Sequence, residues 1–290
     1  MIYVTGDMHG DIERFASKEF KQLEPHDTLI VAGDFGFVWD GSRKERRILK
    51  RLGQKKYNIC FIDGPHDNYE RIYGYRETIW RGGRVHRISG SLFHLCRGQI
   101  FNIEGCKIFT FGGGESTDKD IRSENSVWFK EELPTPQHMM TGAKNLDEVD
   151  CKVDYIITHE PPSVVKKAMQ LRAGANIYTN KLNGFLEELN RSVQFRRWYF
   201  GSFHEDKIIT NKHTAVFQKL IPINYDDLPL KPSGDKKYYD EEDDRRLERE
   251  EQSGESVPQN ADAQPPIEET EPQIKLPEVN INELFVDEYN

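Results

Sequence analysis

The sequence predicts a fold of the α/β or α+β class, in which two mixed β-sheets pack together with helices outside them. Short apolar segments alternate with helical segments over the first 70 residues, which is typical of strands joined by helices. In the middle of the chain, strand-like segments follow one another closely around a Glu104-Gly105 turn, which indicates hairpins. Because both kinds of connection occur, we expect both sheets to be mixed.

Five apolar segments, each bounded by glycine or turn residues, are the predicted buried strands. They are Ile2–Thr5, Thr28–Ala32, Ile59–Ile62, Asp154–Thr158 and Trp198–Phe200. Further strands are expected at Leu92–Arg97, Gln99–Ile103 and Lys107–Phe111, with a final hairpin formed by Lys207–Thr210 and Thr214–Leu220. Helices are expected at Ile12–Phe20, Ser42–Gln54, Ser163–Leu171 and Asn183–Val193, and another begins at Thr135-Pro136. Ser42 is the predicted N-cap of its helix.

Charge and composition divide the chain into two regions. Residues 231–290 contain 7 basic and 18 acidic residues, whereas residues 1–230 contain 33 and 31. We therefore assign residues 1–225 to one domain and residues 226–290 to an acidic, Pro/Glu-rich tail that is expected to be disordered. Its last apolar segment, Ile281–Val286, is either a short docking motif for a protein partner or an inert solvated end.

The N-terminus has no basic segment followed by a long apolar stretch, so no signal peptide is expected. No run approaches 18 apolar residues, so no membrane span is expected either. The four cysteines form no C-x-x-C pair, and Cys60 and Cys106 fall within predicted strands, where buried thiols are expected. These features together indicate a protein of the reducing cytoplasm.

Residues suited to binding metal follow each of the five buried strands. They are Asp7 and His9 after the first, Asp34 after the second, His66 after the third, His159 after the fourth and His204 after the fifth. The carboxyl ends of strands in an open α/β sheet meet in one crevice, so these side chains are expected to converge. Carboxylates with imidazoles suit divalent Mn, Fe, Zn, Ni or Co.

The order of these segments makes the sequence recognisable. It resembles the calcineurin-like metallophosphoesterases, whose pattern is D-x-H, G-D, G-N-H-[DE], a histidine at a strand end, and G-H-x-H. It is most similar to the small single-domain bacterial and phage members, which also have stretches like residues 33–41 and 128–134. The resemblance covers about residues 1–222 and implies a four-layer αββα sandwich with a two-metal site.

The resemblance also implies a role for each residue. Asp7, His9 and His204 would hold the first metal, and Asp34 would bridge both metals. His159 would hold the second metal together with the asparagine of G-N-H and the first histidine of G-H-x-H. His66 would contact the phosphate and assist the leaving group.

Two positions depart from the family pattern, and both belong to the second metal. Pro65 occupies the asparagine position and offers no side-chain donor atom. Ser202 occupies the position of the first G-H-x-H histidine and offers only a neutral hydroxyl. We therefore expect one firmly bound divalent metal, with Mn preferred, and a second that is weak or absent.

Two functions remain open at this stage. The first is a metal-dependent phosphoesterase that hydrolyses a phosphate mono- or diester with metal-activated water, using Asp34 and His66. The second is a weakly active or inactive binding module that acts through its pocket or its acidic tail. Arg97 either contacts substrate phosphate or is an exposed hairpin residue. The near-neutral domain and the acidic tail give no indication of nucleic-acid binding.

Overall fold

The computed structural model describes residues 1–116 and 128–223, all of which fall within one compact unit, residues 1–231. It contains the two predicted mixed sheets. One has seven strands in the order β13 (Ile221–Pro222), β1 (Ile2–Thr5), β2 (Thr28–Ala32), β3 (Asn58–Ile62), β6 (Leu92–Leu95), β5 (Gly83–Ser89) and β4 (Glu77–Trp80). The other has six strands in the order β11 (Lys207–Ile208), β12 (His213–Ala215), β10 (Arg197–Phe200), β9 (Tyr155–Thr158), β8 (Cys106–Phe111) and β7 (Gln99–Ile103).

Each sheet has a parallel centre and antiparallel edges. In the first sheet β1, β2, β3 and β6 run parallel, while β4, β5 and β13 are antiparallel to their neighbours. In the second sheet β8, β9, β10 and β12 run parallel, and β7 and β11 are antiparallel. The parallel strands therefore present their carboxyl ends at one edge of each sheet.

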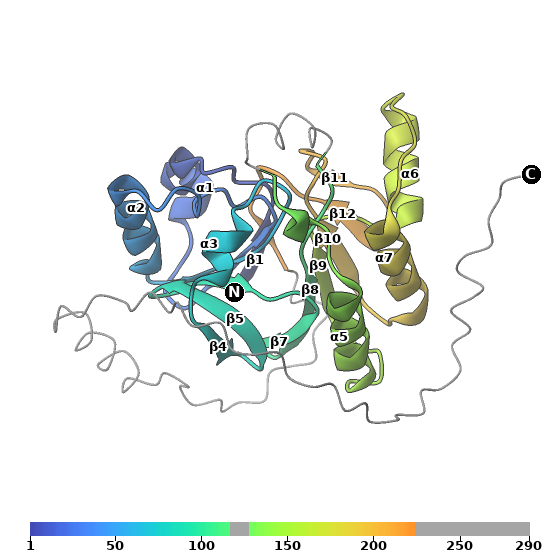
Figure 1. The fold of residues 1–290 in the computed structure, drawn as a ribbon, viewed down its shortest axis with the longest axis horizontal. Helices are drawn as coiled ribbons and strands as arrows, with labels where there is room; N and C mark the ends of the chain where they lie inside the picture. The colour runs from blue at the N-terminus through green and yellow to red at the C-terminus, as the bar shows by residue number, and fades with distance from the viewer. Residues whose placement is uncertain (117–127, 224–290) are drawn as a thin grey trace, which may run out of the picture. The chain divides into compact units, whose positions relative to one another are not determined.

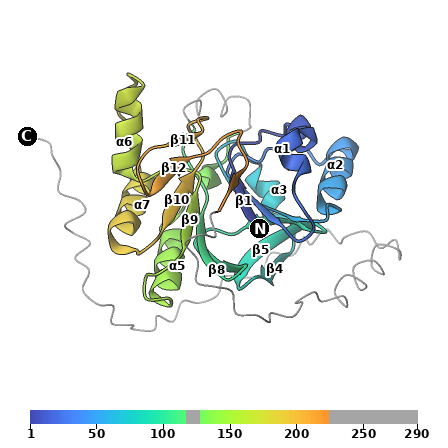
Figure 2. The ribbon, with the colours of Figure 1, turned by 180° about the vertical axis from the view of Figure 1, so that it is seen from behind.

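Helices cover the outer face of each sheet, which gives the four predicted layers (Figures 1 and 2). The helical elements are η1 (Ile12–Ala16), α1 (Lys18–Lys21), α2 (Arg43–Gly53), α3 (Tyr69–Tyr73), η2 (Lys130–Glu132), α5 (Pro136–Asp147), α6 (Ser163–Arg172) and α7 (Lys181–Ser192). Helices α1, α2 and α3 lie on the seven-stranded sheet, and α5, α6 and α7 lie on the six-stranded one.

Three apolar clusters correspond to the three interfaces between these layers. The central cluster joins inward residues of both sheets, such as Ile30 of β2 and Ile157 of β9. A second lies under α1, α2 and α3 and includes Leu29, the neighbour of Ile30. A third lies under α5, α6 and α7 and includes Trp198. Because successive strand residues point to opposite faces, the continuous apolar runs of the sequence are strands buried on both sides.

Two helix starts agree with the sequence and one predicted helix is wrong. Ser42 caps α2 by accepting a hydrogen bond from the Glu45 amide, and Thr135 caps α5 with Pro136 at its first position. The single helix expected at Ile12–Phe20 is instead a 3-10 helix followed by α1. Ser17 breaks it, because its backbone is extended and its side chain accepts a hydrogen bond from the Phe20 amide.

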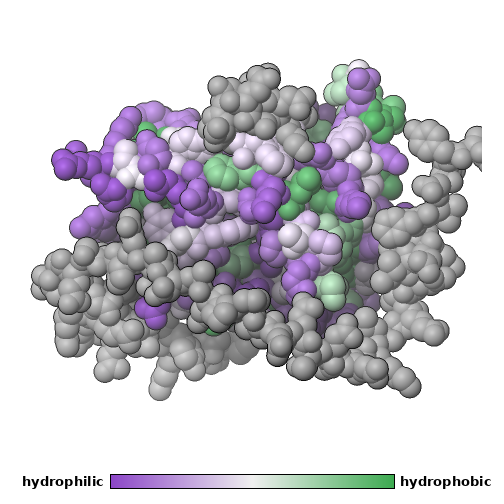
Figure 3. Space-filling view, viewed as in Figure 1, coloured by the Kyte–Doolittle hydropathy of each residue, from purple (hydrophilic) through white to green (hydrophobic). Residues whose placement is uncertain are grey.

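The basic segment Arg43–Arg51 is confirmed as a helix with a solvated outer face. Leu49 and Leu52 are buried, whereas the lysines and arginines of α2 are exposed. The surface over α2 is accordingly hydrophilic in Figure 3. Within the described ranges, no helix is both long enough and apolar enough to cross a membrane.

Cys60 and Cys106 are fully buried, as predicted, and the described cysteines are free thiols. The expected tail at residues 226–290, with its Ile281–Val286 segment, lies outside the described residues.

Candidate metal centre

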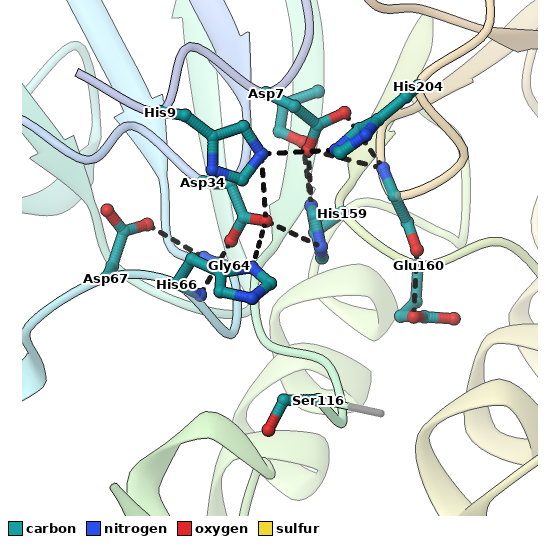
Figure 4. A network of polar contacts seen from close by, with 12 residues as sticks. Asp7, His9, Asp34, Gly64, His66, Asp67, Ser116, His159, Glu160 and His204 are labelled. Atoms are coloured by element: carbon teal, nitrogen blue, oxygen red, sulfur yellow. Dashed lines mark hydrogen bonds and ion pairs between the residues drawn. The ribbon is translucent and has the colours of Figure 1, made fainter. Parts of the chain in front are cut away.

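The structure brings the predicted ligand residues together at the carboxyl ends of strands from both sheets (Figure 4). Asp7 and His9 follow β1, and Asp34 follows β2. His159 follows β9, and His204 lies in the loop after β10. Strands far apart in the sequence thus deliver carboxylates and imidazoles to one place.

Four of these residues could hold one metal ion. Single ligand atoms of Asp7, His9, Asp34 and His204 all lie within 4.8 Å of one another. The Nε2 atoms of His9 and His204 are 3.1 Å apart, and His9 Nε2 is 3.7 Å from Asp34 Oδ2. The two carboxylates are buried, while the two imidazoles are exposed. Two carboxylates and two imidazoles suit a divalent transition metal, so the donor set fits the metal that was predicted.

The backbone at these four residues is strained. Asp7, His9, Asp34 and His204 have φ angles of 30°, 46°, 45° and 50°, in the left-handed region that residues other than glycine rarely adopt. Such strain persists only where surrounding structure enforces it, and it clusters at functional sites. The strain therefore falls on the same four residues that could hold the metal.

His159 lies beside this group, deeper in the protein. It is buried, and its Nδ1 is 3.1 Å from the carbonyl oxygen of Ala32 and 3.4 Å from Asp7 Oδ1. Its Nε2 lies 3.9 Å from Asp34 Oδ2. A proton on Nδ1 satisfies the carbonyl, and Nε2 faces Asp34.

His66 contacts the same carboxylate from the other side. Its ring Nδ1 lies 2.8 Å from Asp34 Oδ2, and its backbone N–H donates to Asp34 Oδ1 at 2.8 Å. The His66 side chain is 42% exposed, whereas Asp34 is 3% exposed. The imidazole therefore stands at the rim, where it can reach a group arriving from solvent.

Ser202 and Pro65, the two positions that the sequence led us to expect as departures from the family pattern, both lie close to this group. The Ser202 hydroxyl donates to Glu160 Oε1 at 3.1 Å, and its backbone N–H donates to Asp7 Oδ2 at 3.1 Å. Ser202 thus orients two carboxylates. Pro65 is buried, and its ring can donate no hydrogen bond.

Without a metal cation, the electrostatics of the centre favour protonation of two buried groups, Asp7 and His159. Burial raises the pKa of Asp7 to about 7, with Asp34 contributing. Although burial opposes it, Asp34 and Asp7 raise the pKa of His159 to about 9. Burial opposes the shift at Asp34 as well, but His159 and His66 lower the pKa of Asp34. Burial lowers the pKa of His9 and of His204, which keeps both imidazoles in the neutral form that binds metal.

Sequence reasoning missed three supporting residues. Asp67 is fully buried and accepts backbone hydrogen bonds from Gly36 and Gly64, which ties the loops after β2 and β3 together. Arg14 donates to the carbonyls of Gly6 and Asp7 and so holds the loop after β1.

Glu160, directly after His159, is the third of them. It is buried and accepts from Lys166 at 2.7 Å as well as from Ser202. Its position after a strand end was the one available signal.

Arg97 is not the exposed hairpin residue that the sequence left open. It is 4% exposed, and its guanidinium binds Asp63 through Nε and Nη2, at 2.8 and 2.5 Å. Nη2 also donates to the carbonyl of Glu131 at 2.8 Å. Its charge is thus balanced by Asp63, the residue that follows β3.

Comparisons with known proteins identify a family for this chain. The model of the calcineurin-like phosphoesterase family matches residues 1–216. Among solved structures, a protein of unknown function from Aquifex aeolicus, AQ665, is 14% identical, with 67% of this chain and 87% of that chain covered at a TM-score of 0.32. No curated protein is significantly similar in sequence.

Proposed function

This chain belongs to the calcineurin-like phosphoesterase family, and from that premise we propose that it hydrolyses a phosphate mono- or diester at the centre formed by Asp7, His9, Asp34 and His204. The family as a whole acts through divalent metal. The observation that supports the proposal best is the convergence of these four ligand atoms within 4.8 Å.

In this proposal, Asp7, His9, Asp34 and His204 hold one divalent cation, with Mn²⁺ preferred. A cation in such a site polarises a phosphoryl oxygen and lowers the pKa of a bound water to near neutral. The buried carboxylates supply the negative charge that retains it, and the exposed imidazoles complete the site at the solvent side. An ester can therefore approach without any rearrangement of the buried carboxylates.

We assign the proton for the leaving group to His66. Its Nδ1 is bound to Asp34, so the ring is oriented before substrate arrives. General acid catalysis by a positioned imidazole contributes about 10²–10⁴-fold in rate. Its partial exposure allows it to reach the leaving oxygen.

The second metal position is proposed to be weak. Asp34 and His159 are the only residues that it keeps from the family pattern, and the hydroxyl of Ser202 is already bonded to Glu160. Binding there would also have to displace the proton that the neighbouring carboxylates favour on His159, whose pKa they raise to about 9 against the effect of burial.

The test combines metal analysis with hydrolysis. Purified full-length chain is loaded with Mn²⁺, its metal content is measured, and it is assayed with p-nitrophenyl phosphate and bis(p-nitrophenyl) phosphate. Asp34→Asn should abolish hydrolysis, whereas Asp147→Asn, at an exposed position of α5, should leave it unchanged. About one Mn²⁺ per chain with Asp34-dependent turnover supports the proposal, and turnover independent of Asp34 contradicts it.

A binding module is the second candidate, and the replacements at Pro65 and Ser202 are what favour it. Such a module would keep the metal and bind a phosphorylated ligand without turning it over, or would act through its acidic tail. Metal bound by the wild type, with no hydrolysis of either ester above the Asp34→Asn variant, would favour this candidate.

A further inference from the structure

A second cluster of possible metal ligands lies towards the β4 edge of the seven-stranded sheet, on the neighbouring strands β5 and β6. The strand register places His86 of β5 opposite His94 of β6, and Glu77 of β4 opposite His86. Cys96 follows His94 by two residues, so its side chain points to the same face of the sheet. None of these residues belongs to the centre described above.

The spacing of the donor atoms matches a tetrahedral metal site. His86 Nδ1 lies 3.0 Å from His94 Nδ1 and 3.6 Å from Cys96 Sγ, and one ligand atom from each of the three residues lies within 4.8 Å of the other two. Tetrahedral zinc with ordinary bond lengths places two nitrogens about 3.3 Å apart and a nitrogen and a sulfur about 3.6 Å apart. The two spacings that involve His86 therefore lie within a few tenths of an ångström of those of a tetrahedral zinc site.

The hydrogen bonds of His94 direct its lone pair into the cluster. Its Nε2 lies 2.9 Å from Asp63 Oδ1, and Asp63 is held in turn by Arg97. Because the Asp63 carboxylate only accepts hydrogen bonds, His94 carries its proton on Nε2. Its Nδ1 therefore faces His86 and Cys96 with a lone pair. Metal-binding histidines commonly have such a carboxylate on their second nitrogen.

The cluster is buried but accessible. His86, His94 and Cys96 are 8%, 1% and 8% exposed, and they line a cavity of about 210 Å³ together with Glu77 and Arg84. Three protein ligands leave a fourth position for water on the cavity side. The two nearby arginines add no uncompensated charge, because Arg84 pairs with Glu77 and Arg97 pairs with Asp63.

We propose that His86, His94 and Cys96 bind one Zn²⁺ ion at a site separate from the phosphoesterase centre. Two imidazoles and a thiolate are the soft donors that zinc prefers, whereas the first centre has only oxygen and nitrogen donors. The ligand His94 is joined through Asp63 to the loop that contains His66. Zinc here therefore stabilises that loop without touching substrate.

Cobalt substitution tests the proposal, because a thiolate bound to Co²⁺ gives a charge-transfer band that oxygen and nitrogen ligands do not give. Full-length chain is titrated with Co²⁺ and followed by absorption spectroscopy. The band should appear in the wild type and in Asp34→Asn, be lost in Cys96→Ser and His86→Gln, and persist in Cys151→Ser, whose thiol lies outside the cluster. Addition of Zn²⁺ should remove it.

Metal analysis gives a second readout that does not depend on cobalt. Zn²⁺-loaded Cys96→Ser should contain about one ion fewer per chain than Cys151→Ser. The site is refuted if folded wild type shows no thiolate band, or if the band and the zinc content survive Cys96→Ser. Because the wild type alone can give the negative result, a variant that fails to fold leaves the test intact.

Discussion

Asp34 accepts two hydrogen bonds from His66, one from its ring and one from its backbone N–H, each at 2.8 Å. A residue proposed to hold the metal thus also fixes the residue proposed to protonate the leaving group. The paired bonds set both the position and the orientation of the imidazole. Loss of the ring should therefore affect the chemical step while leaving the metal in place.

The variant His66→Gln tests whether His66 acts in the chemical step and not in metal binding. We expect kcat to fall by about 10²–10⁴-fold for an alkyl phosphate ester, whose leaving oxygen needs a proton. The loss should be much smaller for p-nitrophenyl phosphate, because p-nitrophenolate leaves without one. The measurement is kcat for both esters with metal content determined in parallel, and exposed His26→Gln is the control. Equal losses for the two esters would show that His66 does not act as an acid.

The double variant Pro65→Asn, Ser202→His should restore the second metal position. It supplies the two donors that the family pattern has beside Asp34 and His159. We expect the content of bound Mn²⁺ to rise from about one to about two ions per chain, because the two added side chains complete the ligands of the second metal. Elemental analysis after gel filtration measures this, and each single variant is the control. A content that stays at about one would contradict the assignment of these two positions.

The main features of the fold were predictable because burial on both faces leaves continuous apolar runs between turn residues. Strands β1 and β2 begin and end as predicted for that reason. Strands β4 and β5 were missed; β4 alternates exposed and half-buried residues at the sheet edge and so shows no continuous apolar run. The two-residue strand β13 was also missed, because it is too short to show any period.

The candidate centre was predictable only in part, for a similar reason. Asp7, Asp34 and His159 each come one or two residues after the end of a buried strand, so the sequence marks their place. Asp63 and Arg97 are 34 residues apart in the chain, and only the pairing of β3 with β6 brings them together. Sequence could not distinguish a buried, paired arginine from an exposed one.

Removal of metal should destabilise the protein more as pH rises. Burial raises the pKa of Asp7 to about 7, and against burial the two carboxylates raise the pKa of His159 to about 9. Both pKa values exceed those of the unfolded chain, about 3.9 and about 6.5. The metal-free protein therefore holds extra protons, and the stability they provide is present at low pH and lost as pH rises through about 7 and about 9.

A bound cation replaces these protons, so the holo protein should not show that loss. The measurement is the free energy of unfolding in urea, with and without EDTA, at about pH 5 and about pH 9. The effect of EDTA should be clearly larger at the higher pH. An equal effect at both pH values would mean that metal binding is not coupled to these two groups.

Arg97→Met should destabilise the fold severely, because it leaves the Asp63 carboxylate buried without its cation. Removing one partner of a buried ion pair costs about 3–5 kcal/mol. Arg191→Met is the matched control, since Arg191 is 64% exposed and pairs with Glu187 and Glu188 of its own helix, α7. Urea denaturation of both variants gives the comparison, and similar small losses would contradict a structural role for Arg97.

Gly33 is the position where a single methyl group should disturb the centre most directly. Its φ is +97°, and a Cβ there would lie 2.0 Å from Nδ1 of His159. Gly105 has a similar φ of +79° but no atom within 4 Å of its Cβ position. Alanine at either glycine adds the backbone strain of a positive φ, so the difference between the two variants isolates the contact with His159.

We expect Gly33→Ala to be less stable than Gly105→Ala by about 1–3 kcal/mol, the usual cost of overpacking a buried site. Gly33→Ala should also bind metal more weakly, because a displaced His159 disturbs its contacts with Asp7 and Asp34. Urea denaturation and Mn²⁺ titration of the two variants measure these effects. If the two alanine variants proved equally stable and bound Mn²⁺ equally well, His159 would not be packed against Gly33 as the structure has it.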